Sequence, residues 1–179
     1  MTQNRTLSLI LPAFGAAIIA ALAQIIIPIG AVPITLQTFA IGLVAAILKP
    51  REATLAATLY LILGAIGLPV FAGGGGGLQA FFGPSAGYLL AYPFFALVTS
   101  ALAHAKTPIW KIFLAFVLGD ALVFVGGILS LHFLGKMGWS AAVAVGLTPF
   151  IIPDLLKGLI VALVTKPVLK ALKNHSYFN

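Results

Sequence analysis

Long apolar stretches separated by short clusters of glycine, proline or basic residues form the dominant pattern along this chain. Residues 55–66 and 112–117, for example, are apolar on every face that a helix would present. A membrane β-barrel would instead alternate polar and apolar positions. The pattern therefore predicts six transmembrane helices, at about residues 7–29, 36–48, 52–67, 85–104, 109–133 and 152–172.

The composition places these helices in a membrane. Hydrophobic residues make up 61% of the chain, charged residues make up 7%, and the mean hydropathy is +1.17. A soluble domain of 179 residues would need far more polar surface to cover its outside. We therefore expect an all-α integral membrane protein with a single transmembrane domain over residues 1–179.

The first apolar segment imitates a secretory signal peptide, because Arg5 precedes it and Ala21, Leu22 and Ala23 look like a cleavage site. The apolar run continues through residues 25–27, however. We therefore interpret this segment as the first membrane helix.

The basic residues predict the orientation of the chain. Six crossings place both termini on one side, and Lys136 is assigned to a loop on the other side. The ends and loops of the first side carry Arg5, Lys49, Arg51, Lys106, Lys111, Lys166, Lys170 and Lys173. By the positive-inside rule, that side is cytoplasmic. The net charge of +7 then reflects membrane orientation, so we expect the bilayer and no nucleic acid as a partner.

Several classes of protein are disfavoured by what the chain lacks. It contains no cysteine, and no phosphate-binding loop of the Gly-x-x-x-x-Gly-Lys-Ser/Thr type occurs. His104, His132 and His175 fall in no metal-ligand spacing, although a haem held by His104 and His132 stays a minor alternative. We expect no enzyme activity, no metal site and no resident cofactor.

The second and third segments are too short to cross a membrane as ordinary helices. At about 1.5 Å per residue they span only about 20 to 24 Å, against a hydrocarbon core of about 30 Å. Both adjoin loops on the outer side, at residues 30–38 and 69–77. Short segments interrupted by glycine and proline often mark a transport site, since irregular backbone at membrane depth must line a cavity or be buried.

Asp154 and Lys157 are the strongest candidates for a ligand site. The chain has only three acidic residues, Glu52, Asp120 and Asp154, and ionisable groups inside a membrane are costly. Positions i and i+3 share one helix face, so Asp154 and Lys157 can present a carboxylate and an ammonium to one outward-facing cavity. A mutual ion pair without a ligand role is equally compatible with this spacing. The role of Asp120 stays open.

The glycine run formed by Gly73, Gly74, Gly75, Gly76 and Gly77 has two interpretations. It is either a flexible linker or a loop that approaches a ligand closely through left-handed backbone conformations. The surrounding aromatic residues either wall an apolar pocket or pack against lipid and neighbouring helices; they are Phe71, Phe81, Phe82 and Tyr88.

Small residues repeat along the first predicted helix. Such spacing allows another helix to approach closely, either within the bundle or in a partner. One row consists of Ala13, Ala17 and Ala21, and the neighbouring row of Ala16 and Ala20.

Five motifs resemble those of the BioY family, the biotin-binding S components of energy-coupling-factor (ECF) vitamin transporters. In chain order they are VPITLQT at 32–38, KPR at 49–51, YLILGAIGLPVFAGG at 60–74, GPSAGY at 83–88 and TPFIIPDLLK at 148–157. The resemblance covers about residues 30–165 with matching gaps, and Lys49 replaces a usual glycine.

The resemblance implies the six-helix fold of ECF S components, with a biotin pocket near the outer face. Asp154 and Lys157 would hydrogen-bond the vitamin, while loops carrying Thr35, Gln37 and the glycine run would close over it. A membrane T component and two cytoplasmic ATPase subunits would dock through small residues of the first helix. A solitary biotin transporter, or a carrier or channel for another small solute, is the alternative.

Overall fold

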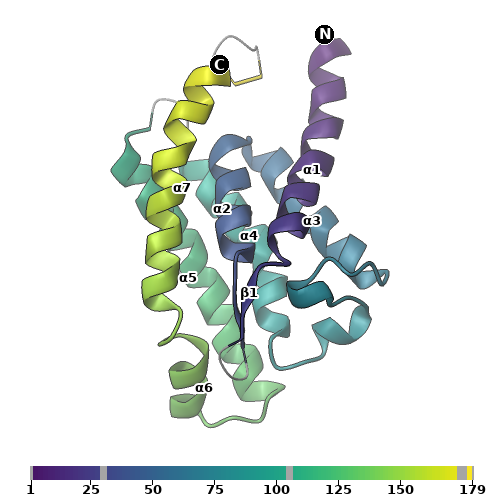
Figure 1. Ribbon diagram of the computed structural model, residues 1–179, viewed down its shortest axis with the longest axis vertical. Coiled ribbons are helices and arrows are strands. Elements are labelled where there is room, and N and C mark those ends of the chain that lie inside the picture. The colour runs from purple at the N-terminus through teal and green to yellow at the C-terminus, as the bar shows by residue number, and fades with distance from the viewer. Residues whose placement is uncertain (1, 29–31, 104–106, 173–176, 179) are drawn as a thin grey trace.

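The computed structural model describes residues 2–28, 32–103, 107–172 and 177–178, and at the N-terminus it describes side chains from Thr6 onward. The described part does not include Lys106, Lys173, His104, His175 or the side chain of Arg5. Within it, helices form a bundle (Figure 1). The α-helices are α1 (Thr2–Leu22), α2 (Gln37–Ile47), α3 (Pro50–Ala65), α4 (Ala86–Leu102), α5 (Ile109–Phe133), α6 (Trp139–Gly146) and α7 (Ile151–Leu172).

Each of the six predicted segments overlaps one of these helices, but the prediction for residues 7–29 is wrong at its C-terminal end. Helix α1 ends at Leu22, and β1 (Ile26–Ile27) pairs antiparallel with β2 (Ile34–Thr35). The β-branched run at 25–27 is followed by Pro28, which disfavours helical backbone in the preceding residue. An extended hairpin therefore replaces the last turns of the expected helix.

The loop after α3 contains two single-turn 3₁₀ helices, η1 (Ala72–Gly74) and η2 (Leu78–Phe81). A further helix, α6, was not expected from the sequence, and it meets α7 at a bend of 43°. Pro149 lies in the break between them, where its ring and missing N–H oppose a continuous helix.

The start of α1 and the end of α7 lie at the same end of the molecule, and α6 lies at the opposite end (Figure 1). Helices α4 and α5 pack along each other more extensively than any other pair. Gly87 on α4 and Gly126 on α5 allow this, because a Cβ atom at either position would meet the backbone of the other. Ser130 on α5 also donates a 2.8 Å hydrogen bond to the Pro84 carbonyl just before α4.

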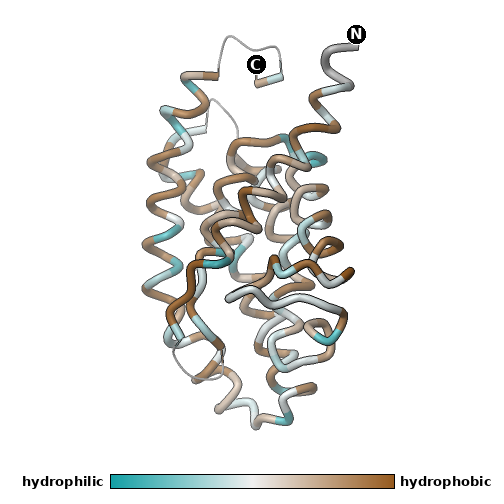
Figure 2. Tube along the Cα trace, turned by 45° about the vertical axis from the view of Figure 1, so that its right-hand side comes forward, coloured by the Kyte–Doolittle hydropathy of each residue, from teal (hydrophilic) through white to brown (hydrophobic). Residues whose placement is uncertain are grey.

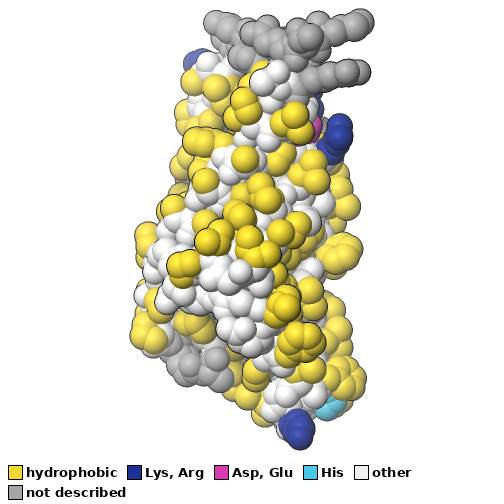
Figure 3. Space-filling model, turned by 90° about the vertical axis from the view of Figure 1, so that its right-hand side faces the viewer, with side chains coloured by type: hydrophobic (Ala, Val, Ile, Leu, Met, Phe, Trp, Pro, Cys, Tyr) yellow, Lys and Arg dark blue, Asp and Glu magenta, His cyan; other side chains and the backbone are white. Residues whose placement is uncertain are grey.

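Large apolar side chains lie both inside and outside the bundle. Tyr60, Phe95 and Phe116 are fully buried, whereas Phe14 and Ile152 are among many exposed apolar residues. Hydrophobic positions follow the helices along their length (Figure 2). On the face in Figure 3, Lys and Arg side chains appear only toward the two ends of the molecule.

Helix α5 alone, among the described residues, is long and apolar enough to cross a membrane by length and composition, and the bent pair α6–α7 adds a second span if taken together. Three other apolar helices are shorter than this: the Thr6–Leu22 part of α1, α2 and α4.

Candidate ligand-binding site

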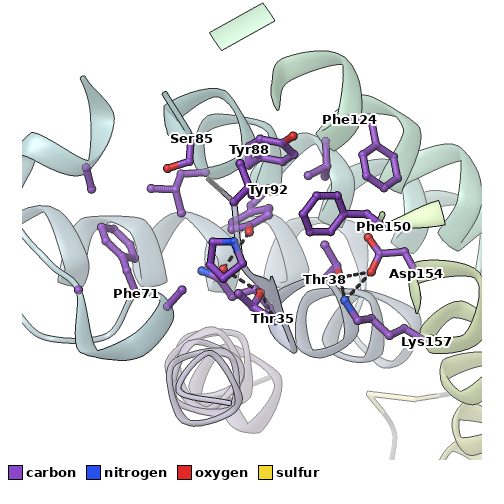
Figure 4. A pocket seen from close by; sticks show the side chains of 18 of the residues that line it. Thr35, Thr38, Phe71, Ser85, Tyr88, Tyr92, Phe124, Phe150, Asp154 and Lys157 are labelled. Carbon is purple, nitrogen blue, oxygen red and sulfur yellow. Dashed lines mark hydrogen bonds and ion pairs between the residues drawn. The ribbon is translucent and has the colours of Figure 1, made fainter. Parts of the chain in front are cut away.

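A cavity of about 430 Å³ lies between α2, α4, α5, α7 and the two loops that precede α2 and α4. Apolar and aromatic side chains make up most of its wall, and Figure 4 shows Phe71 on one side and the charged residues on the opposite side. The sequence-predicted residues that line it are Thr35, Gln37, Phe71, Gly75, Gly76, Tyr88, Asp154 and Lys157. Gly73, Gly74 and Gly77 lie outside the lining.

Asp154 and Lys157 form a buried ion pair on the first turns of α7, and both line the cavity. Thr38 on α2 completes the group: its hydroxyl donates to Asp154 Oδ1 at 3.2 Å and accepts from Lys157 Nζ at 3.1 Å (Figure 4). All three residues are buried. The two charged residues are therefore paired with each other and also face the cavity, and their contact with a ligand stays a prediction.

This group keeps hydrogen-bonding capacity for a ligand. The hydrogen bonds to Asp154 both end on Oδ1, which leaves Oδ2 as an acceptor. An ammonium group has three donors, and Lys157 uses two of them on Asp154 and Thr38. Asp154 and Lys157 thus present one hydrogen-bond acceptor and one donor to the cavity.

Gln37 organises a second polar region at the start of α2. Its Oε1 accepts hydrogen bonds from Thr35 Oγ1 at 3.0 Å and from Tyr92 OH at 3.2 Å. Its Nε2 donates to Tyr60 OH at 2.6 Å, and the backbone N–H donates to Thr35 Oγ1 at 3.1 Å. These bonds hold the Gln37 side chain between three hydroxyl groups.

The aromatic walls are held from behind. Tyr88 donates a 2.7 Å hydrogen bond to the Gly146 carbonyl of α6 and packs over Gly127, where a Cβ atom would collide with its ring. Phe71 makes edge-on ring contacts with Tyr60 and Phe81, at centroid distances of 5.5 and 5.7 Å. Of the aromatic residues singled out from the sequence, Phe71 and Tyr88 line the cavity, and Phe82 is 76% exposed.

The glycine run is a defined turn. Gly73, Gly74 and Gly77 have φ angles of 64°, 79° and 91°, in the left-handed region that other residues avoid. Gln24, which follows α1, donates from Nε2 to the carbonyls of Val70 at 3.3 Å and Phe71 at 3.4 Å. The loop is therefore tied to the end of α1, and its ligand contacts stay a prediction.

The two alanine rows of α1 differ in exposure. Ala16 is fully buried and Ala20 is partly buried, so this row packs within the bundle. Ala13, Ala17 and Ala21 are exposed. Ala16 is therefore not available to a partner, because neighbouring helices already cover it.

Sequence reasoning missed several lining residues. Thr38 lies inside a quoted motif, and Tyr92 follows Tyr88 by one helical turn, so both had a detectable signal. Phe124 and Phe150 resemble any other apolar residue of their segments. Their place beside the charged group (Figure 4) depends on how α5 and α7 pack.

The described residues contain no group of three or more His, Cys, Asp or Glu side chains that could hold a metal ion. His132 stacks on Trp139 with ring centroids 3.9 Å apart, and its Nδ1 lies 2.7 Å from the Met137 carbonyl oxygen. These contacts give His132 a structural role at the α5–α6 end of the bundle.

The architecture is that of a vitamin-transporter S component. A crystal structure of the S-component for biotin from an ECF-type ABC transporter matches with a TM-score of 0.88 and 28% sequence identity, covering 100% of this chain and 99% of that one.

The sequence narrows this class to one family. The BioY family model matches residues 1–174, and the chain belongs to the BioY family. A biotin transporter of Lactococcus lactis subsp. cremoris is 42% identical over 180 residues, covering 99% of each chain. A biotin transporter of Thermotoga maritima is 39% identical over 142 residues, covering 79% of this chain and 83% of the relative.

Proposed function

We propose that this protein binds biotin in the described cavity and takes it up as the S component of an ECF-type transporter. The observation that carries the proposal is the Asp154–Lys157–Thr38 group, which presents a donor and an acceptor in an otherwise largely apolar cavity of about 430 Å³. Ligand pockets of about 300 to 1,000 Å³ with few, well-placed polar groups are typical for small molecules.

The chemistry of biotin suits this cavity. Its ureido ring offers two N–H donors and one carbonyl acceptor, which complement Asp154 Oδ2 and the remaining Lys157 proton. Its sulfur-containing ring and aliphatic chain match apolar walls such as Phe124, Phe150 and Tyr88. No resident cofactor forms part of this proposal.

The proposed setting is the bacterial cytoplasmic membrane, with six spans and both termini in the cytoplasm. The many exposed apolar side chains and the common end shared by the start of α1 and the end of α7 support it. Short helices such as α2 would cross together with their loops, where the bundle covers the irregular backbone.

We further propose a membrane T component and two cytoplasmic ATPase subunits as partners, docked through the exposed row of α1. Small residues at Ala13, Ala17 and Ala21 allow close helix approach there. Solitary transport is the alternative, and it predicts biotin uptake in a host that lacks any T component and its ATPases.

Equilibrium binding of labelled biotin to the purified protein tests the proposed ligand. We expect a one-to-one complex whose affinity falls in Asp154→Asn and is unchanged in Lys136→Gln, a basic residue outside the cavity lining. Wild-type protein that folds and binds no biotin would overturn the proposal.

A further inference from the structure

Asp120 lies in the interior of α5 and has no role in the cavity described above. Its side chain is 5% exposed, and Oδ1 is the only fully buried side-chain oxygen or nitrogen among the described residues without a hydrogen-bond partner. A buried carboxylate oxygen without a partner is costly, so this position calls for a physical explanation.

Asp120 is close to the ligand cavity. Val123 and Phe124, which follow it by one helical turn, both line that cavity. An ionised Asp120 is near enough to interact electrostatically with Asp154 and Lys157.

Few titratable groups face Asp120 from the helices that pack against α5. Helix α4 carries Tyr88 and Tyr92, and the near part of α7 carries Asp154 and Lys157. Helices α2 and α6 carry none. The remaining titratable residues of α5 and α7 lie toward helix ends, at Lys111, His132, Lys166 and Lys170.

The charges in this interior do not balance. Two carboxyl groups, Asp120 and Asp154, share one nearby ammonium group, and Lys157 is already bonded to Asp154 and Thr38. Ionised Asp120 would add an unpaired negative charge to an apolar interior. A proton on its carboxyl group removes that charge.

We infer that Asp120 is a proton-binding site in the folded protein, linked to the binding of an anionic ligand in the adjacent cavity. The linkage, though not the bound proton itself, rests on the proposed function. Biotin carries a carboxylate, and its negative charge opposes ionisation of Asp120. Biotin affinity is therefore highest while Asp120 holds the proton. It falls as the pH rises and Asp120 loses that proton.

Infrared spectroscopy of ligand-free protein tests the proton directly, because the chain contains only two aspartates. With ¹³C-carboxyl aspartate, we expect at neutral pH a protonated-carboxyl carbonyl band that shifts on labelling and is lost in Asp120→Asn. Absence of the band in wild type, or its persistence in Asp120→Asn, overturns the inference. Should Asp120→Asn fail to fold, Asp120→Glu decides in its place, because the label enters aspartate alone: a band that no longer shifts on labelling supports Asp120, and a band that still shifts overturns the inference.

Biotin titrations at increasing pH test the linkage. We expect wild-type affinity to fall by up to about tenfold per pH unit once Asp120 ionises, while Asp120→Asn shows no such fall. Equal pH dependence in the two proteins overturns the linkage. Affinity that rises with Na⁺ concentration at fixed pH, without pH dependence, would assign a metal cation in place of the proton. If neither protein binds biotin, the proposed ligand fails while the infrared result still decides the protonation of Asp120.

Discussion

Tyr60 holds Gln37 in place from behind the cavity wall. Gln37 Nε2 donates a 2.6 Å hydrogen bond to the Tyr60 hydroxyl. Gln37 lines the cavity, whereas Tyr60 is fully buried behind it and does not line it. The Tyr60 ring also contacts Phe71, which lies before the glycine run. One side chain of α3 thus supports the start of α2 and the loop that carries the glycine run, both of which border the cavity.

Tyr60→Phe removes this support while keeping the ring. A Gln37 N–H then loses its buried partner, which costs about 1 to 3 kcal/mol. We expect a lower unfolding temperature and biotin affinity reduced by roughly fivefold, equivalent to about 1 kcal/mol. Tyr177→Phe is the matched control, because Tyr177 accepts a 3.1 Å hydrogen bond from the Lys49 backbone and does not line the cavity. Equal affinities in the two variants would remove the positioning role.

Asp154→Asn and Lys157→Gln each break one partner of a buried charged pair. The remaining group is left unpaired beside the ligand, so we expect a loss of binding on the order of 2 to 5 kcal/mol in each variant. The double variant should lose less than the sum, because both side chains act as one unit. Calorimetric titration with biotin measures this coupling. Wild-type affinity in both single variants would show that the pair is structural alone.

Gly74→Ala tests the left-handed turn of the glycine run. A Cβ atom there has room, with Gln24 Oε1 the nearest atom at 3.9 Å, so backbone strain of about 1 to 2 kcal/mol is the main expected cost. Gly75→Ala is the control, because Gly75 has a φ of −65° that alanine adopts readily. Thermal unfolding of the two variants gives the comparison, and equal stability would contradict it.

We also expect biotin to slow hydrogen exchange across residues 72–78. Loops that close over a ligand usually open more readily than the core around them. Mass spectrometry with and without the vitamin measures the effect. Identical exchange would indicate that this loop does not close on the ligand.

Replacing Ala17 and Ala21 with Trp tests the exposed face of α1. Bulky side chains there should block docking of the proposed T component and abolish uptake, while biotin binding to the isolated protein stays close to wild type. Ala16→Trp is the contrasting variant, because it inserts a large ring into the core and should destabilise the fold. Unimpaired uptake by the Ala17/Ala21 variant would point to solitary transport or another docking surface.

The apolar pattern predicted the positions of six helices because long hydrophobic runs and their punctuation are local properties of a chain. It failed in two places: residues 26–27 pair with 34–35, and Trp139–Gly146 forms a separate helix that meets α7 at a bend. Asp154 and Lys157 stood out because charge is rare in this chain. Thr38 bridges them from another helix, so spacing within one segment could not reveal its contacts.

The backbone contact between Gly87 and Gly126 determines which parts of the protein can move when a ligand enters. Helices that meet through their main chains cannot slide without separating, and Ser130 also ties α5 to the residue that begins the turn before α4. We therefore expect α4 and α5 to keep their relative position. Ligand entry and release are then expected to depend on β2 and on the loop that carries the glycine run, which line the cavity away from the contact between α4 and α5.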